Sequence, residues 1–159
     1  MAPQVVIIMG SKADLAHAQS VAKTLKALKI NYEMRVCSAH KATRRLFEIL
    51  QQYEQANPLV YITIAGRSNA LSAVVDANTL HPVIACPPYS DRFGGMDILS
   101  SLRLPSGIAS PTILEPEGAA LLAAKILALS DTQLGQRLSA YKLRFTAELA
   151  QADEEVKQL

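Results

Sequence analysis

The chain has 159 residues, of which 50% are hydrophobic and 19% charged. This composition suits one ordinary domain with a full core and excludes a generally disordered chain. With no Trp, 5% aromatic residues and a formal net charge of +2, the chain lacks the stacking surface and dense positive charge of a nucleic-acid-binding protein. No apolar run reaches the roughly 18 residues that a membrane span requires.

The N-terminal segment and the cysteines narrow the possibilities further. The segment MAPQVVIIMGS lacks the basic start and the long apolar run of a signal peptide, so we expect a cytoplasmic protein. The two cysteines, Cys37 and Cys86, supply neither a disulfide framework nor four zinc ligands. We expect both to be buried as small apolar groups, and no spacing of His, Cys and carboxylates suggests a metal site.

The first half of the chain alternates between predicted strands and helices. The unbroken apolar run over residues 5–9 is typical of a strand buried on both faces, whereas the alternating pattern over 32–37 favours a less buried strand near a sheet edge. In order, we expect a strand over 5–9, a helix over 15–28, a strand over 32–37, a helix that opens at Ser38, a strand over 59–65 and a short helix to about Ala77.

The second half continues this alternation. Pro82 opens a predicted strand at a position where a strand tolerates proline, and Pro116 stands at the first position of a helix that is apolar nearly all round. In order, we expect a strand over 82–86, a loop over 87–97, a short helix over 98–102, a loop over 102–107, a fifth strand around 112–114 and a buried helix from Pro116 to about Leu129.

Strands that alternate with helices predict an α/β fold, with a parallel sheet covered on both faces, in a single domain over residues 1–159. Apolar side chains three or four residues apart over 134–156 predict one long amphipathic helix after the last strand. This helix packs either on its own domain or on a neighbouring subunit. We favour the second alternative, because the helix is longer than the sheet is wide, and we place residues 131–157 in an oligomer interface.

Polar segments follow four predicted strands, at the sheet edge where ligands bind in open parallel sheets: GSKAD, SAHK, GRSN and PPYSDRFGG. In the first, Ser11 and Asp14 fit a helix capping box. The alternative is functional: backbone N–H groups after Gly10 and the Ser11 hydroxyl hold a phosphate at the helix start, and Asp14 binds a ribose. GRSN also has two interpretations. It is either a glycine turn in which Asn69 caps the next helix, or a cluster of hydrogen-bond donors that holds a small neutral or anionic group.

Three histidines require separate interpretations. A lone histidine such as His40 is more often structural than catalytic, but a helix start and the adjacent Lys41 would favour a neutral imidazole able to accept a proton. Lys41 also offers a charge for phosphate or carboxylate. We interpret His17 and His81 as structural. The charged residues of the later loops are expected to be solvated or paired between loops unless the loops close on a ligand; these are Asp91, Arg92, Asp97 and Arg103.

Together these segments resemble the aminoimidazole ribonucleotide (AIR) carboxylase, or PurE, family of purine biosynthesis. The resemblance covers residues 5–129 and rests on six segments in order: VVIIMGSKADL, VCSAHKA, IAGRSNAL, PVIACPP, SSLRLPSG and EPEGAALLAAKILAL. Members of the first class rearrange an N-carboxylated ribonucleotide and usually carry SAHR and a GAAHL-type loop. Members of the second class use CO2 directly and carry SAHK, GRSN, CPP and SSLRLPSG. This chain resembles the second class at each point, and it departs from the usual pattern at ALSAV after GRSN and at RFGG.

The resemblance implies a flavodoxin-like three-layer αβα fold and a homo-tetramer or homo-octamer with active sites near neighbouring subunits. It also implies carboxylation of AIR at carbon 4 by CO2 as co-substrate, without ATP, biotin or metal. The alternatives are a mutase of the N-carboxylated isomer, a non-catalytic phosphoribosyl-ligand module and an interaction protein. The implied general acid/base is His40, and the implied substrate-binding residues are Gly10, Ser11, Asp14, Ser38, Ala39, Lys41, Gly66, Arg67, Ser68 and Asn69, with Ser68 and Asn69 near the CO2.

Overall fold

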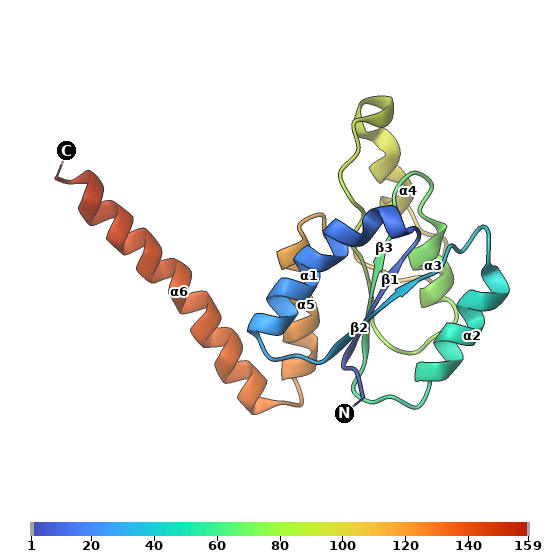
Figure 1. Cartoon of the computed structure of the whole chain (residues 1–159), viewed down its shortest axis with the longest axis horizontal. Helices are drawn as coiled ribbons and strands as arrows, with labels where there is room; N and C mark the ends of the chain where they lie inside the picture. Colours follow the sequence, from blue (N-terminus) through green and yellow to red (C-terminus); the bar gives the residue numbers. More distant parts are fainter. Residues whose placement is uncertain (1, 159) are drawn as a thin grey trace.

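A parallel β-sheet forms the centre of the computed structural model, which describes residues 2–158 (Figure 1). The strand order is β2-β1-β3-β4, which is the order of a flavodoxin-like sheet. The two central strands are buried along their whole length and the edge strand β2 is not, as their apolar and alternating patterns predict. The strands are β1 (Val5–Met9), β2 (Tyr32–Val36), β3 (Val60–Ile64) and β4 (Val83–Ala85).

The fifth strand expected around residues 112–114 is reduced to a single bridge between Thr112 and Ala85. The Ala85 amide donates to the Pro111 carbonyl at 2.9 Å, and the Ile113 amide donates to the Ala85 carbonyl at 2.8 Å. The pairing stops there because β4 is followed by Pro87 and Pro88, which have no amide hydrogen to donate. The prediction of a full strand was therefore wrong, although the segment lies beside β4 as expected.

The helices differ from the sequence pattern at two places: α2 begins at Thr43 and not at Ser38, and the 3-10 helix η2 (Arg92–Ile98) lies largely in a segment predicted as a loop. Residues 38–42 form a turn, in which the Ala42 amide donates to the Ser38 carbonyl at 2.9 Å and the Lys41 amide to Ser38 Oγ at 3.3 Å. The helices are α1 (Leu15–Ala27), preceded by the 3-10 helix η1 (Lys12–Asp14), α2 (Thr43–Tyr53), α3 (Ala70–Asp76), α4 (Leu99–Leu102), preceded by η2 (Arg92–Ile98), α5 (Pro116–Ala128) and α6 (Thr132–Val156).

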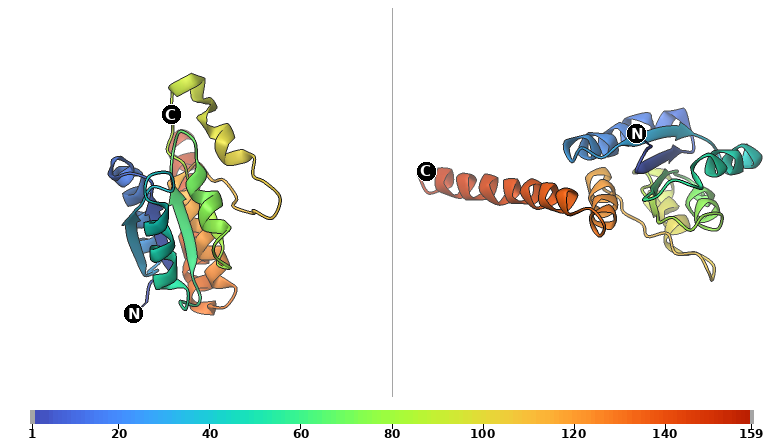
Figure 2. Two further views of the ribbon diagram at one scale, coloured as in Figure 1. Left: turned by 90° about the vertical axis from the view of Figure 1, so that its right-hand side faces the viewer. Right: turned by 90° about the horizontal axis from the view of Figure 1, so that it is seen from below.

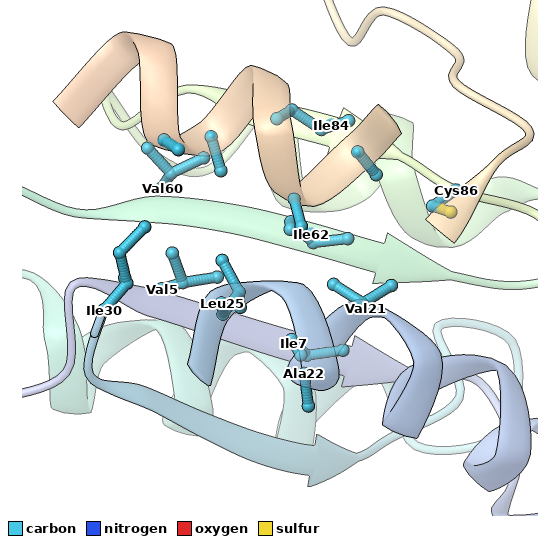
Figure 3. Packing of buried hydrophobic residues seen from close by; sticks show 14 of the residues in the cluster. Val5, Ile7, Val21, Ala22, Leu25, Ile30, Val60, Ile62, Ile84 and Cys86 are labelled. Atoms are coloured by element: carbon cyan, nitrogen blue, oxygen red, sulfur yellow. The ribbon is translucent and has the colours of Figure 1, made fainter. Parts of the chain in front are cut away.

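Helices cover both faces of the sheet, with α1 and α5 on one face and α2 and α3 on the other (Figure 2). Alternate residues of each central strand enter the two layers. Val5 and Ile7 of β1 pack with Ile62 of β3 and Leu25 of α1 on the first face, as Figure 3 shows. On this face α5 presents mainly alanines, which allow its close approach to α1 and the sheet. The predicted burial of α5 is confirmed, and Pro116 occupies its first turn.

The long helix α6 extends away from the body of the molecule (Figures 1 and 2). Only its first two turns contribute buried side chains, Leu134 and Leu138. Further along, Phe145, Leu149 and Val156 continue the apolar stripe but are 37%, 72% and 67% exposed. The predicted long amphipathic helix is thus present, and the outer part of its stripe is unpartnered in the monomer. Within residues 2–158, no helix is both long and apolar enough to span a membrane.

We propose that the outer stripe of α6 packs on a neighbouring subunit, and we expect the double variant Phe145→Asp/Leu149→Asp to form a smaller assembly. Two charges on this stripe would be buried without partners in an interface. The measurement is light scattering, with circular dichroism to verify the helix. The matched control, Ala147→Asp/Ala150→Asp, places the same charges on the opposite side of the helix and should leave the assembly unchanged. If both variants assemble like the wild type, α6 is not in the interface.

Candidate functional site

The three strands β2, β1 and β3 end at the same level of the sheet, because Met9 pairs with both Val36 and Ile64. The segments that follow them therefore begin side by side. Between β1 and β3 the strand order changes direction, and α1 and α2 leave toward opposite faces, which is where open parallel sheets bind ligands. A cleft of about 580 Å³ lies at this point.

The cleft brings together all but one of the residues singled out from the sequence. From the turn after β1 come Gly10, Ser11 and Asp14, and from the turn after β2 come Ser38, Ala39, His40 and Lys41. From the loop after β3 come Gly66, Arg67 and Ser68, whereas Asn69 does not reach the cleft wall.

One wall of the cleft has no residue that was assigned to the site from the sequence, although its segment, PPYSDRFGG, was placed at the ligand-binding edge of the sheet. It comes from the loop after β4, whose charged residues were expected to be solvated or paired between loops. The signal that could have identified it was already available, because this loop follows a parallel strand just as the other three segments do. The residues that this loop adds to the wall are Pro88, Tyr89, Ser90, Arg92 and Asp97.

The turn after β1 is a capping box that also faces the cleft. The Ser11 amide donates to Asp14 Oδ2 at 3.1 Å, and the Ala13 amide donates to Ser11 Oγ at 3.2 Å. Because these two amides are engaged, the Lys12 amide and the Ser11 hydroxyl hydrogen are the donors of this turn without an acceptor in the described chain. Burial raises the pKa of the Asp14 carboxyl, although the Ser11 amide and the nearby His17 act in the opposite direction.

His40 and Lys41 lie in the turn between β2 and α2, and both are exposed to the cleft. Because α2 starts only at Thr43, His40 lies in the turn before the helix and not at the helix start where the sequence placed it. The His40 ring makes no hydrogen bond with any described residue. Its amide and that of Ala39 are likewise without an acceptor there, so this turn offers two N–H donors and a free imidazole.

The loop after β3 is held in place by two serines of α4. Arg67 has a left-handed backbone with φ 59°, a conformation that costs a non-glycine residue about 1–2 kcal/mol. The Ser100 hydroxyl lies within hydrogen-bonding distance of the Arg67 carbonyl, at 2.9 Å, and accepts from the Asn69 amide at 3.0 Å. These contacts of Ser100 hold the backbone on both sides of Ser68, whose side chain remains exposed in the cleft.

Asn69 has a structural role below this loop. It is 4% exposed; its Oδ1 accepts from the Ser72 amide at 3.3 Å, and its Nδ2 donates to Ser101 Oγ at 2.9 Å. The side chain caps α3, as the alternative interpretation of GRSN predicts. With both ends of the amide engaged, Asn69 is not available in this structure to contact a ligand in the cleft.

Neither cysteine lines the cleft and neither do the other two histidines; the cysteines are buried, and His17 and His81 are half-buried. His17 Nε2 lies 3.4 Å from Cys86 Sγ, and burial is the main cause that lowers the pKa of His17. Burial raises the pKa of Cys86 to about 12 and also raises that of Cys37, so both thiols stay protonated. The expected burial of both cysteines is confirmed. His81 lies with its ring centroid 6.1 Å from that of Tyr61, outside the cleft.

The charges of the cleft suit an anion. Lys41, Arg67 and Arg92 supply three positive charges, against the carboxylates of Asp14 and Asp97. Asp97 also accepts a hydrogen bond from Ser90 Oγ at 2.9 Å, so it orients its own loop. In residues 2–158, three or more His, Cys, Asp and Glu side chains nowhere meet in an arrangement that could hold a metal ion. The cleft thus combines hydrogen-bond donors and positive charges that suit a phosphate with one histidine, His40, whose ring has no hydrogen-bond partner among the described residues.

Comparison with known proteins decides which family uses this arrangement. A family model described as AIR carboxylase matches residues 4–148. The chain belongs to the AIR carboxylase family. It is therefore an enzyme, a carboxylase of purine biosynthesis.

Individual AIR carboxylase relatives match over nearly the whole chain. A phosphoribosylaminoimidazole carboxylase from Archaeoglobus fulgidus is 49% identical over 152 residues, which cover 96% of this chain and 84% of the relative. Another from Treponema denticola is 46% identical over 158 residues, 99% of both chains. The crystal structure of Treponema denticola PurE matches with a TM-score of 0.95 at 45% identity and covers 98% of this chain and 99% of that one.

Asn69 is buried and the neighbouring Ser68 is exposed, and this difference leads to a prediction about stability. We expect Asn69→Ala to lower the free energy of unfolding by about 2 kcal/mol, because it removes a helix cap and leaves Ser101 without its buried donor. The matched variant Ser68→Ala, at an exposed side chain, should change it by less than about 0.5 kcal/mol. Urea unfolding measures both. Normal stability with lost turnover in Asn69→Ala would return this residue to the substrate-binding set.

Proposed function

We propose that this protein carboxylates AIR at carbon 4 directly with CO2, which is the activity of the second class of its family. The observation that carries the proposal is the position of His40. Its ring is exposed in the cleft, has no hydrogen-bond partner among the described residues and faces turns that supply donors and cations. The printed names of the relatives from Archaeoglobus fulgidus and Treponema denticola, both phosphoribosylaminoimidazole carboxylases, support the same activity.

The 5′-phosphate of AIR fits the donors at the ends of β1 and β2. The Ser11 hydroxyl and the amides of Ala39 and His40 are available as hydrogen-bond donors, and Lys41 adds a positive charge. The Asp14 carboxylate would be repelled by a phosphate, so it is better suited to the ribose hydroxyls. Asp14 keeps its capping bond to Ser11 and still lines the cleft, so the two interpretations of this residue are compatible.

For this reaction the protein has two tasks: it holds AIR and CO2 together, and it removes the proton from carbon 4. An aminoimidazole is an enamine, so carbon 4 is nucleophilic and attacks the carbon atom of CO2. A carbon–carbon bond forms, and the electron pair of one C=O bond moves to oxygen to give a carboxylate. Carbon 4 then carries both the carboxylate and its original proton. We assign removal of that proton to His40 as general base, which restores the aromatic ring.

The class assignment depends on Lys41 and on the loop after β3. Where the first class has Arg after SAH, this chain has Lys41, which provides a mobile point charge instead of a fixed bidentate fork. The histidine that ends the corresponding loop of the first class is replaced by Ala70. Arg67 and Ser68 add polar groups to the cleft where that class has small apolar residues. These differences support a site that admits CO2 from solution.

We expect His40→Asn to retain the fold and the affinity for AIR but to lose turnover by about a hundredfold or more, the usual contribution of a general acid/base. Steady-state kinetics and calorimetric titration with AIR measure the two quantities. The matched control is His81→Asn, because His81 lies outside the cleft. Near wild-type turnover of His40→Asn would reject the assignment. A wild-type protein that binds AIR but never carboxylates it would be a non-catalytic binding module.

The choice between carboxylase and mutase is tested with the wild-type enzyme. We expect product from AIR and CO2. From the N-carboxylated isomer we expect product only through CO2 released into solution, so a separate CO2-consuming enzyme should abolish it. The mutase alternative makes the opposite prediction, because a mutase recaptures CO2 before it escapes. Efficient, trap-insensitive conversion of the isomer would therefore show that the chain is a mutase.

A further inference from the structure

Tyr89 stands on the wall that the loop after β4 adds to the cleft, and the proposed function leaves its side chain without a task. Among the residues that line the cleft in the described chain, only Tyr89 and His40 carry an aromatic ring. The Tyr89 residue is 67% exposed, so much of its ring surface is open to a ligand. An accessible phenol ring at the wall of a nucleotide cleft suits contact with an aromatic group.

A residue outside the cleft wall holds the Tyr89 ring. The Tyr89 hydroxyl donates a hydrogen bond to Glu115 Oε1, and Glu115 does not line the cleft. A hydrogen bond to a carboxylate is about twice as strong as one between neutral groups. This bond is also the main cause that raises the pKa of Tyr89, so the hydroxyl keeps its proton at neutral pH.

Both partners of this hydrogen bond are anchored to β4. Tyr89 follows the strand after Pro87 and Pro88, whose rings fix the backbone φ angle. Glu115 follows the segment that bridges to β4, and its carbonyl accepts from the Ala119 amide at 3.0 Å at the start of α5. Its carboxylate does not cap α5 and is therefore available to Tyr89. The ring is thus held in place before a ligand binds, which lowers the entropy cost of binding.

The order of the strands indicates which part of AIR meets the Tyr89 ring. The 5′-phosphate is assigned to the donors at the ends of β1 and β2, whereas β4 lies on the other side of β3. Neighbouring strands are about 4.8 Å apart, so the end of β4 lies roughly 10 Å across the sheet from the end of β1. A nucleotide with its phosphate at β1 and β2 extends its base toward β4 and Tyr89.

We propose that Tyr89 binds the aminoimidazole ring of AIR by stacking, and that Glu115 positions Tyr89 from outside the cleft. The inference rests on the proposed function, because it takes AIR as the ligand. It adds a specificity determinant to the site. Contacts with the phosphate and the ribose are common to all phosphoribosyl compounds, whereas a ring against Tyr89 selects those that carry an aromatic base.

The test compares AIR with ribose 5-phosphate, a probe that has the phosphate and the sugar but no base. We expect Tyr89→Leu to raise the Kd for AIR about fivefold, which is within the contribution of one aromatic pair. The Kd for ribose 5-phosphate should stay within twofold of the wild type. Calorimetric titration of the full-length protein measures both constants. The kcat at saturating AIR should also stay within twofold, because stacking stabilises the bound substrate and the transition state alike.

Glu115 is tested by a double-mutant cycle. Tyr89→Phe and Glu115→Ala each remove the hydrogen bond and keep the ring, so we expect each to raise the Kd for AIR about threefold. The double variant Tyr89→Phe/Glu115→Ala should also show about a threefold increase, because both changes remove the same interaction. Glu115→Gln keeps an acceptor oxygen and should hold the Kd within twofold of the wild type.

A second Tyr–Glu pair provides a matched control. The Tyr141 hydroxyl donates to Glu117 Oε1 at 3.0 Å, and neither of these residues lines the cleft. Tyr141→Phe removes the same kind of hydrogen bond and should leave the Kd values for AIR and ribose 5-phosphate unchanged. Circular dichroism and light scattering verify that each variant keeps its fold and its assembly.

The outcomes separate this proposal from the proposed function. A wild-type protein that does not bind AIR rejects both. A wild type that carboxylates AIR, with an unchanged Kd for AIR in folded Tyr89→Leu, overturns the stacking proposal alone. Equal losses of affinity for AIR and ribose 5-phosphate would also overturn it, because Tyr89 would then shape the cleft as a whole. Additive losses in the double variant would overturn the positioning role of Glu115.

Discussion

Met9 pairs with Val36 on one side and with Ile64 on the other, and this register places three walls of the cleft. Because the strands end level, Gly10, Cys37 and Ala65 begin their turns at the same height above the sheet. Buried apolar runs fix that register, since a shift by one residue would turn the inward side chains of β1 and β3 to the wrong layer. The position of His40 relative to Ser11 and Ser68 is thus a consequence of how the core below the cleft is packed.

The fourth wall depends on a different kind of order. The loop after β4 has no regular sheet partner, and η2 contains three consecutive residues with positive φ, Phe93, Gly94 and Gly95. Two serines of α4 connect this region to the loop after β3, because Ser100 Oγ accepts a hydrogen bond from the Asn69 amide and Ser101 Oγ accepts one from Asn69 Nδ2. The segment SSLRLPSG, which resembles the family at the level of sequence, therefore acts on the GRSN loop from behind. We therefore expect the loop after β3 and the α4 region to move together.

The parts of the fold that the sequence predicts best are those governed by continuous burial. The runs over β1 and β3 and the alternation in β2 identify their strands, and Pro116 marks the start of α5 because it is suited only to a first turn. The start of α2 was placed five residues early, since Ser38 has the chemistry of a helix cap but accepts its bond from Lys41 within a turn. Nothing local distinguishes these two uses of a serine.

Prediction of the site from the sequence has the same limit. Strand ends identify ten residues of the cleft correctly, yet Asn69 and Ser68 differ only in which way their side chains point, and that direction is set by serines more than 30 residues away in the chain. Likewise, Arg92 and Asp97 belong to the wall because the tertiary structure places their loop beside the turns after β1, β2 and β3. Contacts of this range leave no periodic signal in a sequence.

The two cysteines have a practical consequence that follows from their burial. Cys37 directly follows β2 before the turn of His40, and Cys86 directly follows β4 before the loop of Arg92; they are 4% and 0% exposed. Their raised pKa values leave little thiolate at neutral pH, so neither reacts readily in the closed protein. Modification by a thiol reagent therefore requires a local opening. The native chain consequently carries one chemical reporter for each side of the cleft, and the two labelling rates record the opening of those sides separately, without any engineered probe.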